Sequence, residues 1–119
     1  MEFPKKDWTL FKEKITVWQE NRMAKLCSEY IELLSSSAPS SEKFWALEER
    51  LRHDKRRASV WVRMSRSEMP FAILRLLDEG SITIVDLADF SDEMKEYAQF
   101  HLENRATWNS STEDGEDWK

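Results

Sequence analysis

The chain has 119 residues and a formal net charge of −5; charged residues make up 34% of it, while glycine occurs only twice and proline three times. A chain of this length suits a single domain with its own core, and so few turn residues favour helices over a β-rich fold. The single cysteine, Cys27, excludes an internal disulfide, which favours a reducing compartment such as the cytoplasm. No run of about 18 apolar residues is present, so we expect no membrane span and no membrane partner.

The longest predicted element is an amphipathic helix from Asp7 to about Ser35, a stretch without glycine or proline. Asp7 is the expected N-cap. At 1.5 Å per residue the helix would be about 40 Å long, which exceeds the diameter of roughly 33 Å expected for a compact domain of this size. We therefore expect it to span the whole molecule or to protrude from it. A protruding end would expose Leu10 and Val17, a second, weaker apolar stripe that a partner could cover. The main apolar stripe comprises Trp8, Phe11, Ile15, Trp18, Met23, Leu26, Tyr30 and Leu33.

A serine-rich break, Ser35–Ser41, separates this helix from a second one, which is predicted from Ser41 to about Arg56. Pro39 cannot continue the first helix, and Ser40 can cap the next. Because the linker is short, we expect the two helices to pair as an antiparallel hairpin. The period of the second helix is set by Phe44, Trp45, Leu47, Glu48 and Leu51.

Residues 50–66 form the basic connector, which holds seven Lys or Arg residues against one acid, Asp54, and so has a local charge of +6. Within it, Val60–Met64 alternates like a short strand. With no clear partner strand elsewhere, we expect an extended segment or a marginal strand that pairs across a dimer. The positive charge makes the connector a candidate for binding a polyanion.

Two helices are predicted directly after the connector. The third helix is expected to start at Ser67, which leaves Pro70 within the first turn, where no intrahelical donor is lost. Gly80 is a suitable terminating residue for it. Thr83 and Asp86 have the spacing of a capping box and predict the start of a short fourth helix.

Ser91 is expected to cap a fifth helix that ends near Asn104. Residues 106–119 are polar, acidic and without an apolar period, so they are predicted to form a disordered tail. The sequence thus predicts an all-α fold in which residues 1–105 form one domain of about five helices, built on the long N-terminal helix.

Four stretches of the sequence carry a family resemblance: WTLFKEKITVWQENRMAKLCSEYIELL, SEKFWALEERLRHDKR, MSRSEM and LLDEGSITIVDLADFSDEM. They resemble a group of small bacterial proteins that genome annotation often labels “multidrug transporter”, over about Asp7 to Leu102. The resemblance implies no established activity, and the label looks wrong for this chain because no membrane-spanning helix is predicted. The last stretch also resembles a helical hairpin with Leu-Leu, Asp-Gly and Ile-Thr positions that is found in many small interaction modules.

An enzyme is not expected. Gly80 and Gly115 are the only glycines, so no glycine-rich phosphate-binding loop can be formed. His53 and His101 have no metal-ligand spacing with each other or with Cys27. His101, on an apolar face, is interpreted as a hydrogen-bonded core residue. We therefore predict no catalytic residue, no cofactor and no metal site.

Nucleic-acid binding through the basic connector is the alternative function, because Trp61 could stack on a base beside the arginines. Two features oppose it. The chain is negative overall, and the short helix from Ile84 to Phe90 carries two acids and no base, so phosphate would repel it. The acidic half, residues 78–119, could instead neutralise the connector within the molecule or its dimer.

Protein interaction requires the fewest special residues, because a long helix, a second apolar stripe and many tryptophans all suit self-association. We therefore expect a non-catalytic interaction or regulatory module that forms a homodimer or binds another protein. The residues expected to contact the partner are Leu10, Val17 and Trp18 on the first helix, and Arg56, Arg57, Trp61, Arg63 and Arg66 in the basic connector.

Overall fold

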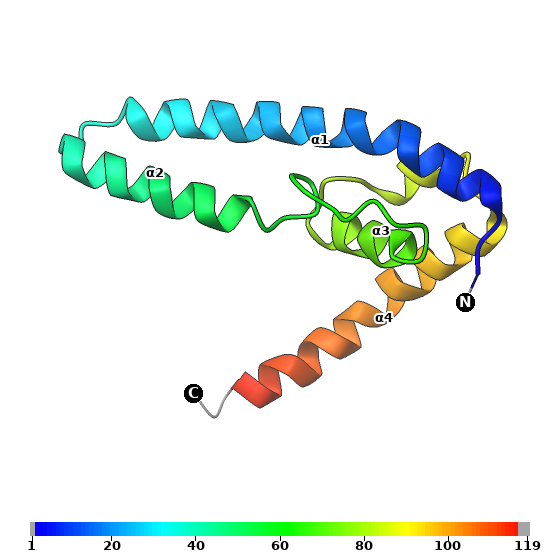
Figure 1. The fold of residues 1–119 in the computed structure, drawn as a ribbon. Helices are drawn as coiled ribbons and strands as arrows, with labels where there is room; N and C mark the ends of the chain where they lie inside the picture. Colours follow the sequence, from blue (N-terminus) through cyan, green and yellow to red (C-terminus); the bar gives the residue numbers. More distant parts are fainter. Residues whose placement is uncertain (1, 117–119) are drawn as a thin grey trace.

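The computed structural model describes the backbone of residues 2–116 and the side chains of residues 2–105. No strand occurs in this part of the chain, so the predicted all-α class, built on one long N-terminal helix, is confirmed (Figure 1). The predicted fourth helix is a single 3-10 turn, η1. The elements are α1 (Lys5–Leu34), α2 (Ser40–Asp54), α3 (Met69–Asp78), η1 (Ile84–Leu87) and α4 (Asp92–Glu116).

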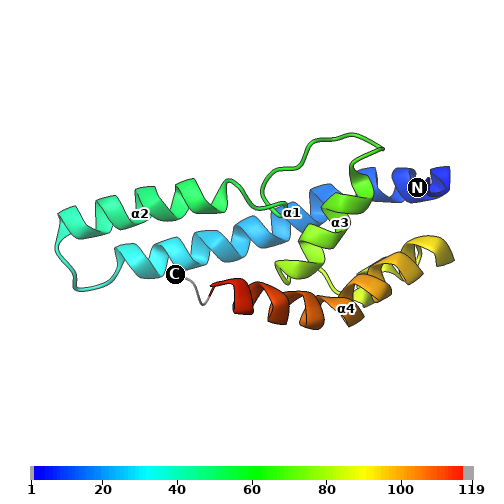
Figure 2. The same ribbon diagram turned by 90° about the horizontal axis from the view of Figure 1, so that it is seen from below.

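Helices α1 and α2 lie side by side and antiparallel, as the short serine-rich linker predicts (Figures 1 and 2). α1 begins directly after Pro4, and α2 begins directly after Pro39. A proline in front of a helix fits because the missing N–H would have no intrahelical partner there. The predicted N-caps, Asp7 and Ser40, are therefore wrong, since both residues lie inside helices.

The hydrophobic core lies beneath the N-terminal half of α1, where α3 and the start of α4 pack (Figure 2). Phe11 and Ile15 of α1 are buried in it, as the main apolar stripe predicts. No residue of α2 belongs to this core. The other buried members are Phe3, Ala58, Val62, Met69, Ala72, Ile73, Leu76, Leu77, Ile82, Leu87, Phe90, Met94 and Ala98.

The turns around η1 follow the predicted capping chemistry. Gly80 has a φ of +76° and, with the residue after it, donates its N–H to the last turn of α3, which forms a Schellman C-cap. Asp86 Oδ2 accepts the Thr83 N–H at 2.7 Å, as a capping box requires. Ser91 Oγ accepts the Met94 N–H at 3.1 Å and so caps α4, as predicted.

Asp7 joins the first turn of α1 to the start of α4. Its carboxylate is fully buried. Oδ1 accepts the backbone N–H of Ser91 at 2.7 Å, and Oδ2 accepts the hydroxyl of the same serine at 2.6 Å. The negative charge also lies at the N-terminal end of α4, where the helix dipole favours it.

Helix α4 is longer than the sequence predicts. It continues to Glu116, whereas the sequence predicts an end near Asn104 and a disordered tail from residue 106. Extending an existing helix fixes one residue for each hydrogen bond gained, so even residues of modest helix propensity can be added. The expected tail is therefore helical up to Glu116, and residues 117–119 lie outside the described residues.

The α1–α2 hairpin extends beyond the core. The radius of gyration is 17.3 Å, whereas a compact chain of this length would have about 13.5 Å. Asp54 is the only buried residue of α2, and Leu26 is the only one of α1 after Ile15. The long helix thus protrudes, but with its C-terminal half and together with α2, not with the part that carries Leu10 (Figure 1).

Candidate interaction surface

The α1–α2 hairpin exposes large apolar side chains on both of its helices. On α1, Ile31 is 64% exposed and Leu34 46%. On α2, Phe44 and Trp45 are each 64% exposed, and Leu51 is 40% exposed. The rings of Phe44 and Trp45 meet edge to face, with their centroids 5.0 Å apart. Apolar residues that gather on one element in this way mark an interaction site more often than scattered ones do.

Two grooves lie on the hairpin. The first has a volume of about 420 Å³ and is lined by both helices, with Leu33, Ala46 and His53 among its residues. The second, of about 180 Å³, lies where α1, α2 and the connector meet, and Met23 and Leu51 contribute to its mainly apolar lining. Concave places of this kind can receive side chains from a packed helix.

A buried polar cluster fixes the base of the hairpin. Asp54, the last residue of α2, is 2% exposed. Its Oδ2 accepts the hydroxyl of Tyr30 in α1 at 2.6 Å, and its Oδ1 accepts the Arg57 Nε–H at 3.1 Å. Arg50 lies 3.7 Å from the same carboxylate and donates to Glu29 of α1 at 2.7 Å. The cluster therefore ties α1 to both α2 and the start of the connector.

The cluster also changes how its members ionise. Burial would raise the pKa of Asp54, but the Tyr30 hydrogen bond and the charges of two neighbouring arginines outweigh it and hold this pKa below its ordinary value. Burial, together with the hydrogen bond to Asp54, raises the pKa of Tyr30 to about 12. At neutral pH the carboxylate is thus ionised and the phenol protonated, which is the pairing that the short hydrogen bond requires.

An alkaline titration is expected to show Tyr30 as a separate step near pH 12, in the near-ultraviolet absorbance of tyrosinate. Tyr30→Phe should remove this step, and Tyr97→Phe should keep it. Unfolded tyrosine ionises near pH 10, so between about pH 10 and 12 only the unfolded state has lost the proton, and stability falls as the pH rises. A titration that is the same in wild type and Tyr30→Phe would contradict the shift.

The arginines of the basic connector bind different partners. Arg57 binds Asp54, Arg66 donates to the Phe3 carbonyl at 3.1 Å, and Arg56 is exposed. Among the described residues, the connector's ion pairs go to four acids between Glu29 and Glu68, and none goes to the acidic half of the chain. Between residues 78 and 105, the acids therefore form no ion pair with this segment.

Glu79 binds the backbone of the connector and not its arginines. Its carboxylate accepts the N–H groups of Ala58 and Ser59 at 2.8 and 3.1 Å, and Gln19 of α1 donates to the Ala58 carbonyl at 3.2 Å. After this anchored turn, residues 61–65 form no regular secondary structure, so the predicted strand is not formed, and the Ser65 N–H donates to the Arg63 carbonyl at 2.9 Å in a tight turn. Trp61 is 65% exposed and lies with Arg63 on one groove, described below.

The three candidate residues on α1 do not form one exposed surface. Leu10 and Trp18 are half-buried and pack against the core. Trp18 also stacks on Phe90, with ring centroids 6.4 Å apart. Val17 is 57% exposed. The predicted second stripe is therefore split, and the exposed aromatic residues of the hairpin, Phe44 and Trp45, lie on α2 instead.

The predicted burial of Phe44, Trp45 and His101 is also wrong. The sequence predicts Phe44 and Trp45 to belong to the apolar period of α2, yet both are exposed. The sequence holds no signal for the exposure of both, because a core-facing stripe about 100° wide can hold two neighbouring residues. His101 is half-exposed rather than in the core, with its Nε2 2.9 Å from Asp78 Oδ1.

In the described part of the chain, no group of three or more His, Cys, Asp or Glu side chains is placed to hold a metal ion. None of the helices there has the length and apolar content that a membrane span requires. Comparisons with protein-family models, curated proteins and solved structures find no match.

Proposed function

We propose that the protein is a non-catalytic interaction module that self-associates through the α1–α2 hairpin. The observation that supports this proposal is the set of large exposed apolar side chains on a hairpin that has almost no core of its own. In the proposed homodimer, the hairpins of two copies pack into a four-helix bundle. Each copy offers the same surface, as a two-fold dimer requires.

The composition of the hairpin favours such a contact. Phe44 and Trp45 are aromatic anchors of the kind that dominate the binding energy of protein interfaces. Helix α2 carries four acidic and three basic residues, so its charge is close to zero although the whole chain is at −5. Two identical surfaces of nearly balanced charge can approach each other without strong repulsion.

Sedimentation equilibrium over a range of concentrations tests the proposal. We expect the wild type to be dimeric at about 100 μM, a concentration well above the dissociation constants of most specific dimers. Trp45→Glu should weaken the dimer by at least about tenfold, because it removes a large apolar contact and places a charge in the interface.

The matched control is Val85→Glu, which makes the same kind of change on η1 at a side chain that is 75% exposed and outside the hairpin. This variant should dimerise like the wild type. A wild type that stays monomeric at about 100 μM would contradict the proposed self-association. A dimer that survives Trp45→Glu unchanged would place the interface away from the hairpin.

Nucleic-acid binding by the basic connector stays the alternative. Exposed Trp61 and Arg56 favour it. The acids that already pair with Arg50 and Arg57 oppose it, because each pair has to be broken before the arginine is free for phosphate. We therefore rank it below the hairpin, and the oligonucleotide experiment described in the next subsection tests it. A cytoplasmic location and a regulatory role are further parts of the proposal, with Cys27 as the support for the first.

A further inference from the structure

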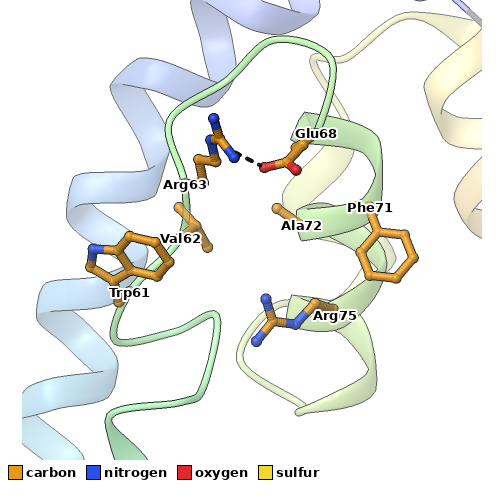
Figure 3. A pocket seen from close by; sticks show the side chains of 7 residues that line it. All are labelled: Trp61, Val62, Arg63, Glu68, Phe71, Ala72 and Arg75. Carbon is orange, nitrogen blue, oxygen red and sulfur yellow. Dashed lines mark ion pairs between the residues drawn. The ribbon is translucent and has the colours of Figure 1, made fainter.

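A groove of about 430 Å³ lies between the basic connector and α3 (Figure 3). Its floor is apolar, because Val62 of the connector and Ala72 of α3 are both almost completely buried. Trp61 and Phe71 flank the groove on opposite sides, and each is 65% exposed. This groove is separate from the exposed residues of the hairpin, none of which lines it.

Two guanidinium groups reach into the space above this floor. Arg63 enters from the connector and Arg75 from α3, one at each end of the groove (Figure 3). Arg75 uses one N–H for the carbonyl of Arg56 at 2.8 Å and retains further donors. Arg63 Nε lies 3.9 Å from Glu68, and both side chains are largely exposed, so this ion pair is weak and can be exchanged. The ends of the groove therefore favour carboxylates.

The connector also offers main-chain groups along the groove. Residues 61–65 have no regular secondary structure. In the described part of the chain, the N–H groups of Val62, Arg63 and Met64 donate to no other backbone group. Free N–H groups in a segment outside regular secondary structure can donate to carbonyls of a bound peptide main chain.

We propose that this groove binds an extended acidic peptide segment of a partner protein. One apolar side chain of the peptide rests on Val62 and Ala72, between the two aromatic flanks. Carboxylates on either side of it bind Arg63 and Arg75, whose forked donors match carboxylate geometry. The peptide backbone pairs with the free N–H groups of the connector. This site goes beyond the proposed dimer and does not depend on it.

The apolar floor of the groove and the free N–H groups of the connector favour a peptide over a nucleic acid as the ligand. Single-stranded nucleic acids need aromatic faces on which bases stack, together with a continuous positive track. Here Trp61 and Phe71 lie on opposite sides of an aliphatic floor, and Glu68 interrupts the positive charge (Figure 3). Free backbone N–H groups suit a peptide main chain, which presents one carbonyl acceptor per residue.

Fluorescence anisotropy with a labelled peptide in which leucine and glutamate alternate tests the proposal on the full chain. We expect saturable binding that weakens as salt is raised. Arg63→Ala should weaken binding about tenfold, since a charge-assisted contact is lost. Glu68→Gln should strengthen it about threefold, because the competing carboxylate is removed. A merely structural role of the groove would not produce these opposite effects.

Arg52→Ala is the matched control, because Arg52 is an exposed arginine on α2 that pairs with Glu48 and lies outside the groove. It should bind the peptide like the wild type. Equal binding of a leucine–lysine peptide, or an unchanged affinity in Arg63→Ala, would overturn the proposal. Tighter binding of a single-stranded oligonucleotide that also depends on Arg63 would overturn it in favour of nucleic-acid binding.

Discussion

Replacing Asp7 by alanine is expected to lower the free energy of unfolding by about 3–4 kcal/mol. The carboxylate is fully buried and accepts both the N–H and the hydroxyl of Ser91. Removing it leaves these two donors buried without a partner and takes a negative charge from the N-terminal end of α4. Urea unfolding followed by tryptophan fluorescence, at one fixed protein concentration, measures the change.

Asp89→Ala is the control for this experiment. Its side chain is 76% exposed and lies 3.9 Å from Lys14, so its loss should change stability by no more than about 0.5 kcal/mol. Asp7→Asn should fall between the two variants, because the amide can still accept one of the two hydrogen bonds. If Asp7→Ala were no less stable than Asp89→Ala, the buried contact with Ser91 would not stabilise the fold.

Asp54→Asn is expected to lower the free energy of unfolding by about 2–3 kcal/mol, because Tyr30 and Arg57 lose a buried ionised partner. The effect is smaller than for Asp7 since the arginines of this cluster are partly exposed and can be hydrated. Because Asp54 fixes the base of the hairpin, the same variant should also weaken the proposed dimer in sedimentation. Glu48→Ala, which removes an exposed ion pair of α2, is the control for both measurements.

The pH dependence provides a second measurement on Asp54. Its pKa is lower in the folded than in the unfolded state, so its contribution is present above the unfolded value of about 3.9. The contribution is lost as the pH falls further, through the lower folded pKa. The stability difference between wild type and Asp54→Asn should therefore shrink on acidification below about pH 4. A difference that stays constant down to lower pH would contradict the lowered pKa.

Local sequence signals predicted much of the fold. Phe11 and Ile15 recur at helical spacing and are buried, and the short linker at Pro39 gives the antiparallel hairpin. Gly80 adopts the positive φ that a C-cap favours, and Thr83 with Asp86 forms the contact of a capping box. All of these features depend on residues within a few positions of one another, so one sequence is enough to predict them.

The polar contacts of the structure could not be predicted in this way. Asp7 and its partner are separated by 84 residues, so nothing near Asp7 distinguishes a buried carboxylate from an N-cap. The same holds for Tyr30 and Asp54, which come together only because the hairpin closes. The groove beside Trp61 depends on how α3 packs against the connector. The spacing of residues in the sequence does not determine how far apart these two segments lie.

The long separation between Asp7 and Ser91 also has a consequence for a chain that is still being synthesised. The carboxylate of Asp7 has no partner until the ribosome has made the start of α4. The hairpin is complete as soon as Asp54 has emerged, since Tyr30 precedes it by only 24 residues. Folding during synthesis proceeds from the N-terminus. We therefore expect the hairpin, which is the proposed dimer contact, to form on the nascent chain before the core does.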